Sequence, residues 1–440
     1  MKYKYELGIF GGKVCISNTI QNVSIGINSG KIIKIGNIDK KDCLNKIDAS
    51  NKHILPGVID TQVHFREPGL THKEDISFGT KSALLGGVTT IFEMPNTSPA
   101  TINEEEFNKK IEIAKKSSWT NFSFFIGACK ENLERLSYLE KLKGCSGIKI
   151  FLGSSTGSLL VSGEEDIEIA LKNCKRRVAI HSEDESRIKE RFKSINVNNG
   201  VKEHPVWRDK KTALISTKKV LKYSSKYKTK SHILHISTKD EIELLKEKDR
   251  QITVEVTPQH LTLYSPDCYN NLGTLAQMNP PIREKSHQEG LWNGIHTGVV
   301  DVIGSDHAPH TLEEKKRKWP NSPSGMPGVQ TLLPLMLNHV NNKKIDLLKL
   351  VQLISTNPAK IYKIKNKGDI KIGFDADITI IDLKKELLIE DSLIQSKCGW
   401  TPFHGMKVTG CPVATIVNGK IKMQNGEIVG NPNGKIVEFN

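Results

Sequence analysis

The chain has 440 residues, of which 37% are hydrophobic and 26% charged, a make-up that suits a globular protein with a large core. Its net charge of +15 comes mostly from dispersed lysines without interleaved aromatic residues, which favours a solvated surface over one that binds nucleic acid. No apolar run approaches the roughly 18 residues of a membrane span. The N-terminal "MKYKYELGIFGG" lacks the features of a signal peptide. We therefore expect a cytoplasmic protein, and its positive field suits a small anionic substrate.

The two ends of the chain are predicted to form antiparallel β structure. Residues 1–55 contain short alternating runs such as "GKIIKIGNIDK", and residues 367–440 contain similar runs in "DADITIIDLKK" and "PVATIVNGKIKMQNGEIVG". Neither end is large enough to bury much surface alone. We therefore expect both ends to combine into one small β-sandwich domain.

Between the ends, eight apolar, β-branched runs alternate with amphipathic segments. The runs are "HILPGVIDTQVHF", "GVTTIFEMP", "NFSFFIGA", "GIKIFLG", "RVAIHSED", "SHILHIST", "ITVEVTPQH" and "VVDVIGSDHAP". The segments include Glu105–Lys116, Ile167–Lys175 and Lys239–Lys248. Strands buried on both faces and alternating with helices are typical of α/β proteins. Eight such units predict a (β/α)₈ TIM barrel over residues 56–366.

Five of these runs carry a residue of a metal-ligand type at or near the carboxyl end, where barrel enzymes have their active sites. These residues are His64, Lys149, His181, His235 and Asp306. A single histidine in an apolar strand is usually a packed core residue, but five such positions predict one shared site. A lysine inside a barrel either pairs with a carboxylate or is kept neutral by burial. A neutral amine can add CO₂ and form a carbamate, which can bridge two cations.

Seven motifs accompany the predicted strands: "IDTQVHFREPG", "EMPNT", "GIKIFLGSSTGSLLV", "AIHSED", "LHIST", "QMNPPIR" and "GSDHAPHTLEEK". Together they resemble the metal-dependent amidohydrolase superfamily, and within it the class I dihydroorotases. The resemblance covers nearly the whole chain. It implies a hydrolase of de novo pyrimidine biosynthesis that interconverts N-carbamoyl-L-aspartate and L-dihydroorotate. It also implies a homodimer.

The resemblance implies two zinc ions bridged by a carbamylated Lys149. His181 and His235 would hold one ion, and an H-x-H pair with Asp306 would hold the other. Here Gln62 stands in place of the first histidine of that pair, and its neutral oxygen is a poorer zinc ligand than imidazole. With the carbamate and a solvent ligand, each ion still reaches four ligands. We therefore expect two zinc ions ahead of one or none, with Gln62 at most a weak fifth ligand.

The resemblance also assigns roles toward the substrate. Asp306 would be the catalytic proton relay, Arg66, Asn96 and His310 would bind the substrate carboxylate, and Asn279 would contact the ring. From the residues alone, Arg66 could instead pair with a neighbouring carboxylate, Asn96 could be a turn residue, and His310 could cap the following loop. That loop, residues 310–328, is predicted to be a lid or a substrate loop.

Two alternative functions stay open. One is a related cyclic amidohydrolase of the allantoinase or hydantoinase type, whose substrates need no carboxylate clamp. The other is a non-catalytic, dihydroorotase-like scaffold, to which Gln62 points. The retained Lys149 favours an enzyme, since a scaffold has little physical reason to keep a lysine inside a barrel.

Overall fold

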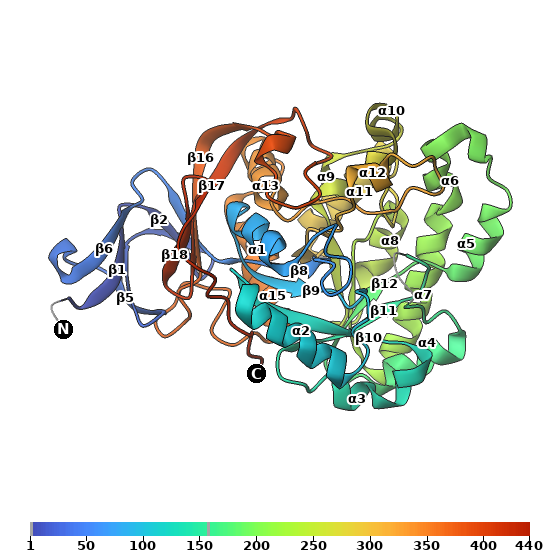
Figure 1. Cartoon of the computed structure of the whole chain (residues 1–440), viewed down its shortest axis with the longest axis horizontal. Helices are drawn as coiled ribbons and strands as arrows, with labels where there is room; N and C mark the ends of the chain where they lie inside the picture. The colour runs from blue at the N-terminus through green and yellow to red at the C-terminus, as the bar shows by residue number, and fades with distance from the viewer. Residues whose placement is uncertain (1–2, 156–158) are drawn as a thin grey trace.

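The computed structural model describes residues 3–155 and 159–440, and a sheet of eight parallel strands forms its centre (Figure 1). The strands, in sheet order, are β8 (Val58–Val63), β9 (Val88–Glu93), β10 (Asn121–Gly127), β11 (Cys145–Phe151), β12 (Arg177–His181), β13 (Lys230–Ile233), β14 (Thr253–Val256) and β15 (Val302–Ile303). The backbone N–H of His64 donates to the His307 carbonyl at 2.7 Å, which links the first strand to the last. The predicted (β/α)₈ barrel is confirmed. Residues 156–158, within the motif "GIKIFLGSSTGSLLV", lie outside the described part.

Helices surround the barrel and connect its strands. They are α1 (Ile76–Leu85), α2 (Glu104–Ser117), α3 (Leu136–Leu139), α4 (Glu164–Asn173), α5 (Glu185–Phe192), α6 (His204–Trp207), α7 (Lys210–Tyr227), α8 (Lys239–Leu244), α9 (Pro258–Thr262), α10 (Asp267–Leu272), α11 (Lys285–His296), α12 (Leu312–Lys315), α13 (Leu332–Asn341), α14 (Leu347–Val351) and α15 (Asn357–Tyr362). In α2 the side chain of Asn103 caps the first turn, and Phe107, Ile111 and Ala114 form the buried face. No helix in the described ranges is long and apolar enough to cross a bilayer.

Shorter turns of helix complete the connections. The 3₁₀ helices are η1 (Lys40–Asp42), η2 (Lys130–Arg135), η3 (Val197–Glu203), η4 (Leu245–Glu247), η5 (Gly273–Ala276) and η7 (Asp391–Leu393), and η6 (Gln352–Thr356) is a π-helix. The segment predicted as Lys239–Lys248 is therefore α8 followed by η4. The segment predicted as Ile167–Lys175 begins earlier, because Gly163 is the N-cap of α4.

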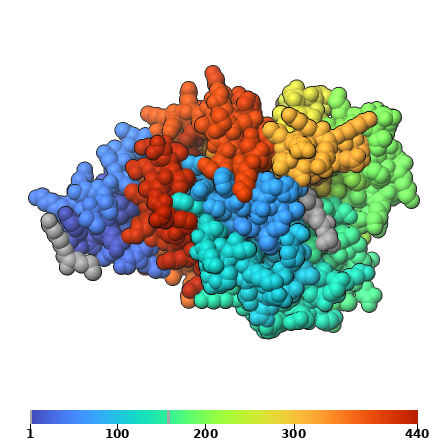
Figure 2. All heavy atoms as spheres, viewed as in Figure 1, coloured from blue at the N-terminus to red at the C-terminus, as the bar shows by residue number. Residues whose placement is uncertain are grey.

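Both ends of the chain build the remaining sheets. One has the order β5 (Lys31–Gly36), β4 (Ser24–Asn28), β1 (Tyr5–Phe10), β6 (Cys43–Asp48). The other has the order β19 (Glu427–Ile428), β18 (Lys420–Gln424), β17 (Lys407–Val417), β16 (Ile378–Leu388), β7 (His53–Pro56), β2 (Lys13–Ile16), β3 (Thr19–Asn22). Figure 2 shows the blue N-terminal and red C-terminal segments side by side. The division at residues 55/56 and 366/367 stays a prediction.

The first predicted barrel strand is in fact two strands. Residues 53–65 divide at Gly57 into β7, which belongs to the sheet built from both chain ends, and β8, which opens the barrel. The backbone N–H of Gly57 donates to the Asp377 carbonyl at 2.8 Å, so the chain leaves one sheet and enters the other at this residue. A continuous apolar run conceals such a division, because both strands are buried.

Gly147 shapes the strand that carries Lys149. Its φ is +140°, and a Cβ at this position would lie 2.0 Å from the Arg177 carbonyl oxygen of the neighbouring strand. Only glycine tolerates both the dihedral angle and the close approach of the two backbones. The glycine therefore lets β11 pair closely with β12 two residues before Lys149.

We expect Gly147→Ala to lower the free energy of unfolding by about 2 kcal/mol or more, since the methyl group would force β11 and β12 apart. Gly163→Ala is the matched control, because its backbone is in the ordinary extended region and its Cβ would meet only the flexible Asp166 carboxylate. Urea unfolding of both variants measures the difference. Equal stability of the two would contradict the close-approach argument.

Candidate active site

A pocket opens at the carboxyl ends of the barrel strands. Its wall is formed by Gln62, His64, Arg66, Asn96, Lys149, Phe151, Ser155, His181, His235, Asn279, Asp306, Ala308, Ser324 and Gly325. The structure therefore brings together every residue that the sequence proposed for this site except His310. That imidazole lies behind the wall, fully buried, in contact with Arg66 and Ser324.

Three wall residues have backbones in the left-handed region. The φ angles are +64° for Arg66, +37° for His235 and +44° for Asp306. Such conformations cost of order 1–3 kcal/mol each for residues other than glycine and persist where packing enforces them. Each residue follows the end of a barrel strand, where the unusual turn directs the side chain into the pocket. No pattern in the sequence predicts these positive φ angles.

His181 and His235 form the first pair of candidate metal ligands. His181 Nδ1 lies 3.1 Å from His235 Nε2. Two nitrogens bound tetrahedrally to one zinc ion are roughly 3.3 Å apart, given bonds of about 2.0–2.1 Å. Burial lowers the pKa of both imidazoles, that of His235 well below its ordinary value, so both are neutral and able to ligate.

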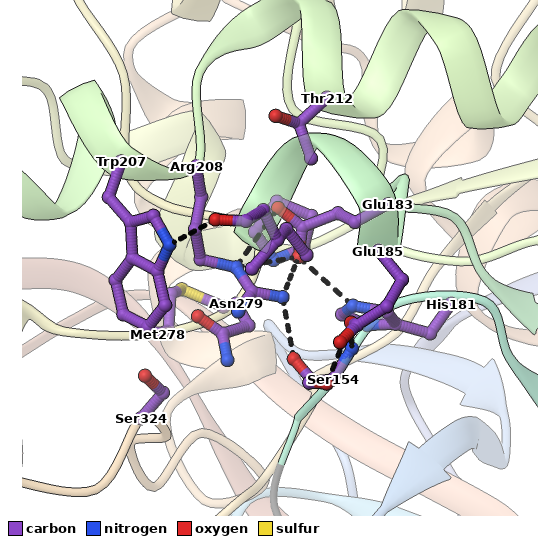
Figure 3. Close-up of polar contacts among 12 residues, drawn as sticks. Ser154, His181, Glu183, Glu185, Trp207, Arg208, Thr212, Met278, Asn279 and Ser324 are labelled. Atoms are coloured by element: carbon purple, nitrogen blue, oxygen red, sulfur yellow. Dashed lines mark hydrogen bonds and ion pairs between the residues drawn. The ribbon is translucent and has the colours of Figure 1, made fainter. Parts of the chain in front are cut away.

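A buried carboxylate orients the His181 ring (Figure 3). Glu183 Oε2 lies 3.0 Å from His181 Nε2, so this nitrogen carries the proton and Nδ1 presents its lone pair to the pocket. Arg208 Nη2 donates to Glu183 Oε2 at 2.6 Å and to the Ser154 carbonyl at 2.8 Å. Burial alone would raise the pKa of Glu183, but Arg208 and His181 lower it below its ordinary value.

The same network holds the segment that follows β11. Glu185 Oε2 accepts hydrogen bonds from the backbone and hydroxyl of Ser154, both at 2.7 Å (Figure 3). Sequence reasoning missed Glu183 and Arg208. The signal for Glu183 was its position two residues after His181 in "HSED", since alternate residues of an extended segment share a face. Arg208 lies too far along the chain for such a pattern.

Lys149 lines the pocket with its amine buried. Its Nζ is buried and makes no hydrogen bond to the described residues, and it lies 4.5 Å from the centroid of the Phe151 ring. Burial lowers the pKa of Lys149 to about 7, although the negative charges of Asp306 and Glu255 oppose this shift. A substantial fraction of the amine is therefore neutral at pH 7, the form that reacts with CO₂.

His64 and Asp306 form the second pair of candidate ligands. His64 Nδ1 lies 2.6 Å from Asn96 Oδ1 and must donate to it, so Nε2 presents a lone pair toward Asp306 Oδ1 at 3.3 Å. Burial lowers the pKa of His64 to about 4, which keeps the ring neutral. Two electron-pair donors that face each other fit a cation between them. Asn96 is therefore more than a turn residue.

Gln62 contributes an N–H group where a histidine would contribute a lone pair. Its Nε2 donates to Asp306 Oδ1 at 2.9 Å, and its Oε1 is buried without a partner among the described residues. The amide thus occupies the Asp306 oxygen that faces His64. If the amide group turned over, Oε1 would point toward the position between the two side chains and could ligate weakly.

The described residues contain no group of three His, Cys, Asp or Glu side chains that could hold a metal by themselves. The donors form two pairs instead, and Lys149 lines the same pocket as both pairs. A carbamate on Lys149 would bring an oxygen to each pair. The donor set therefore fits a metal centre once this lysine is modified.

Arg66 is the cation on the pocket wall. Its guanidinium is buried, Nε donates to the Pro309 carbonyl at 3.2 Å, and Nη1 has no hydrogen-bond partner within residues 3–155 and 159–440. No carboxylate of the described ranges lies within ion-pair distance, so the alternative of pairing with a neighbouring acid is wrong. His310 does not cap the next helix, because Thr311 caps α12.

Two buried residues behind the wall were also missed. His204 Nε2 lies 3.0 Å from Asn279 Oδ1 and positions that amide. Lys315 Nζ donates to the carbonyls of Gln277, Pro323 and Gly325 at 2.9–3.0 Å. These bonds tie residues 310–328 to the pocket rim, and this loop lines the pocket through Ser324 and Gly325.

Comparisons with known proteins agree with this geometry. A model of the amidohydrolase family matches residues 53–422. A dihydroorotase from Pyrococcus abyssi is 37% identical over 431 residues and covers 96% of each chain. A dihydroorotase from Methanosarcina mazei is 34% identical over 451 residues and covers 98% of each. The solved L-hydantoinase (dihydropyrimidinase) from Arthrobacter aurescens has a TM-score of 0.93 at 27% identity, over 98% of this chain and 99% of that one.

If Glu183 orients His181, Glu183→Gln should weaken zinc binding about 10- to 100-fold, since partners of metal-bound histidines contribute about this much. Glu185→Gln is the matched control, because Glu185 contacts Ser154 rather than the imidazole. Competition between each metal-free variant and a coloured chelator gives the affinities, well below the melting temperature. The same affinity in both variants would show that Glu183 does not act on the ligand.

Proposed function

This chain belongs to the amidohydrolase family, and from that premise we propose that it is a hydrolase of a cyclic amide that interconverts L-dihydroorotate and N-carbamoyl-L-aspartate in pyrimidine biosynthesis. Curated relatives named dihydroorotase, 32–37% identical over nearly the full length, support this activity. A cytoplasmic location and a homodimer, both expected from the sequence, belong to the same proposal.

One observation supports the substrate above the others. Arg66 is buried on the pocket wall with unpartnered donors and without a carboxylate at ion-pair distance among the described residues. A guanidinium taken out of water needs an anion, and its planar donors suit a carboxylate. Dihydroorotate carries one beside its cyclic amide. We assign Arg66, Asn96 and His310 to the carboxylate end and Asn279 to the ring.

We assign the metal centre to five side chains. His181 and His235 would hold one zinc ion, His64 and Asp306 a second, and the carbamate of Lys149 would bridge the two. Carbamylation joins the neutral amine nitrogen to the carbon of CO₂ and releases one proton. The family is metal-dependent, and two ions per chain are the finer proposal. Zinc bound here would lower the pKa of a water molecule and polarise the amide carbonyl.

Asp306 moves the proton in this mechanism. Its Oδ1 accepts from Gln62, which leaves Oδ2 free to take a proton from the attacking water. The water oxygen bonds to the ring carbonyl carbon, and Asp306 then delivers the proton to the amide nitrogen as the carbon–nitrogen bond breaks. Arg66 meanwhile fixes the substrate by its carboxylate, so the scissile bond is presented in one orientation. The product is the open-chain ureido acid.

A second candidate activity is hydrolysis of an uncharged ring. Its support is the likeness in fold to the L-hydantoinase of Arthrobacter aurescens. Arg66 has no carboxylate at ion-pair distance among the described residues, which favours a carboxylated ring as the substrate. An uncharged substrate would leave its guanidinium buried without an anion.

The decisive assay follows ring opening of dihydroorotate, allantoin and dihydrouracil by the zinc-loaded protein. We expect dihydroorotate to be the preferred substrate, and Asp306→Asn to reduce kcat at least about 100-fold, because the amide cannot accept the proton. Preference for an uncharged ring would favour the second candidate. Full metal loading with no turnover of any ring would favour the scaffold.

Gln62→His should tighten the weaker of the two metal sites, since an imidazole supplies the lone pair that the amide N–H does not. The wild-type protein, dialysed against limiting zinc with bicarbonate, should retain less than two equivalents, and the variant close to two, by mass spectrometry of the metal. Gln62→Asn is the control, because it keeps an amide. Equal zinc content in all three proteins would contradict the assignment of Gln62 to a metal site.

A further inference from the structure

His310, behind the pocket wall, contacts three groups whose hydrogen-bonding roles are fixed. Lys73 Nζ lies 3.1 Å from its Nδ1, the Ser324 carbonyl lies 3.1 Å from its Nε2, and Arg66 Nη2 lies 3.3 Å from the same Nε2. Ammonium and guanidinium groups only donate, and a carbonyl only accepts. The ring is neutral, because burial and the charge of Arg66 lower the pKa of His310 to about 3. One of its nitrogens therefore donates and the other accepts.

These contacts decide which nitrogen carries the proton. With the proton on Nε2, His310 donates to Ser324 and accepts from Lys73, and only the contact with Arg66 remains unmatched. With the proton on Nδ1, His310 accepts from Arg66, but two donors then meet at Nδ1 and two acceptors meet at Nε2. The first tautomer satisfies two contacts and the second only one.

The chosen tautomer has a consequence for Arg66. Because Nε2 carries a proton, it cannot accept from Arg66, and the Arg66 Nη2 donor faces a second donor. Nη1 of the same guanidinium has no partner at all in the described part of the chain. Adjacent donors without a shared acceptor are the arrangement that binds a carboxylate.

Lys73 is the group on which this choice depends. It lies in the loop between β8 and α1, is 9% exposed, and also forms an ion pair with Glu314 at 2.9 Å. Without the Lys73 ammonium, His310 Nδ1 would lose its donor. Glu314 Oε2, which lies 3.8 Å from that nitrogen and accepts from the Thr311 backbone N–H, could then also accept from Nδ1. His310 could then take the other tautomer and accept from Arg66. The Arg66 Nη2 donor would then be bonded within the protein and would no longer be available to a substrate carboxylate.

We propose that Lys73 is a positioning residue for substrate recognition: by donating to His310 Nδ1 it holds the tautomer that keeps the Arg66 donors free for a substrate carboxylate. This inference rests on the proposed function for the nature of the substrate. It extends the recognition set to a second residue outside the pocket wall, beside His310. It also assigns Lys73 to substrate binding rather than to the chemical step.

The test combines Lys73→Met with two readouts. For zinc-loaded protein we expect the KM for dihydroorotate to rise about tenfold or more, since charge-assisted hydrogen bonds are lost, while kcat stays within about threefold. Nitrogen-15 spectra of histidine-labelled protein should show His310 protonated at Nε2 in the wild type and at Nδ1 in the variant. Lys73→Arg should retain both wild-type properties.

Lys397→Met is the matched control, because Lys397 contacts the carbonyl of Thr71 in the same loop and pairs with Asp75, away from His310. It removes the same charge and should change neither readout. A wild-type His310 protonated at Nδ1 overturns the proposal even if Lys73→Met does not fold. An unchanged KM in a folded Lys73→Met also overturns it. Wild-type protein that opens no dihydroorotate instead refutes the proposed function, and the spectra still decide the role of Lys73.

Discussion

The site depends on two basic side chains that are held out of water without a carboxylate partner in the part of the chain that the structure describes. Lys149 loses its hydration inside the barrel and responds by shifting toward the neutral amine. Arg66 remains protonated at neutral pH, since its pKa falls only to about 10, and its buried positive charge therefore favours binding of an anion. Burial thus acts in opposite ways on two bases of different strength. In the proposed function, the first would react with CO₂ as a nucleophile, and the second would bind a carboxylate.

The fold was largely predictable because it rests on patterns that operate within short windows. Buried parallel strands read as continuous β-branched runs, and eight of them alternating with amphipathic segments define a barrel. The failure at residues 53–65 has the same origin. Burial on both faces looks alike in β7 and β8, so composition could not show that Gly57 separates two sheets.

From residue types and positions alone, without the family resemblance, the site was predictable where residues end a strand. His64, His181, His235 and Asp306 each follow or finish one, and chain position alone brings them to one rim. The supporting shell was not predictable. Behind the pocket wall, Arg208 and His204 belong to a connection between α5 and α7, and Lys73 belongs to a loop. Only the folded chain therefore shows their contacts with Glu183, Asn279 and His310. Candidate metal ligands can be recognised from the sequence at the ends of strands. Which nitrogen of a histidine carries the proton depends on partners that only the folded chain provides.

The strand order of the sheet built from both chain ends constrains how the chain can fold during its synthesis. β7 lies between β2, made among the first residues, and β16, which starts at residue 378. During synthesis, the early strands therefore wait at an open edge while the whole barrel is translated, because their partner has not yet left the ribosome. The amino-terminal segment must avoid pairing with other nascent chains throughout this interval.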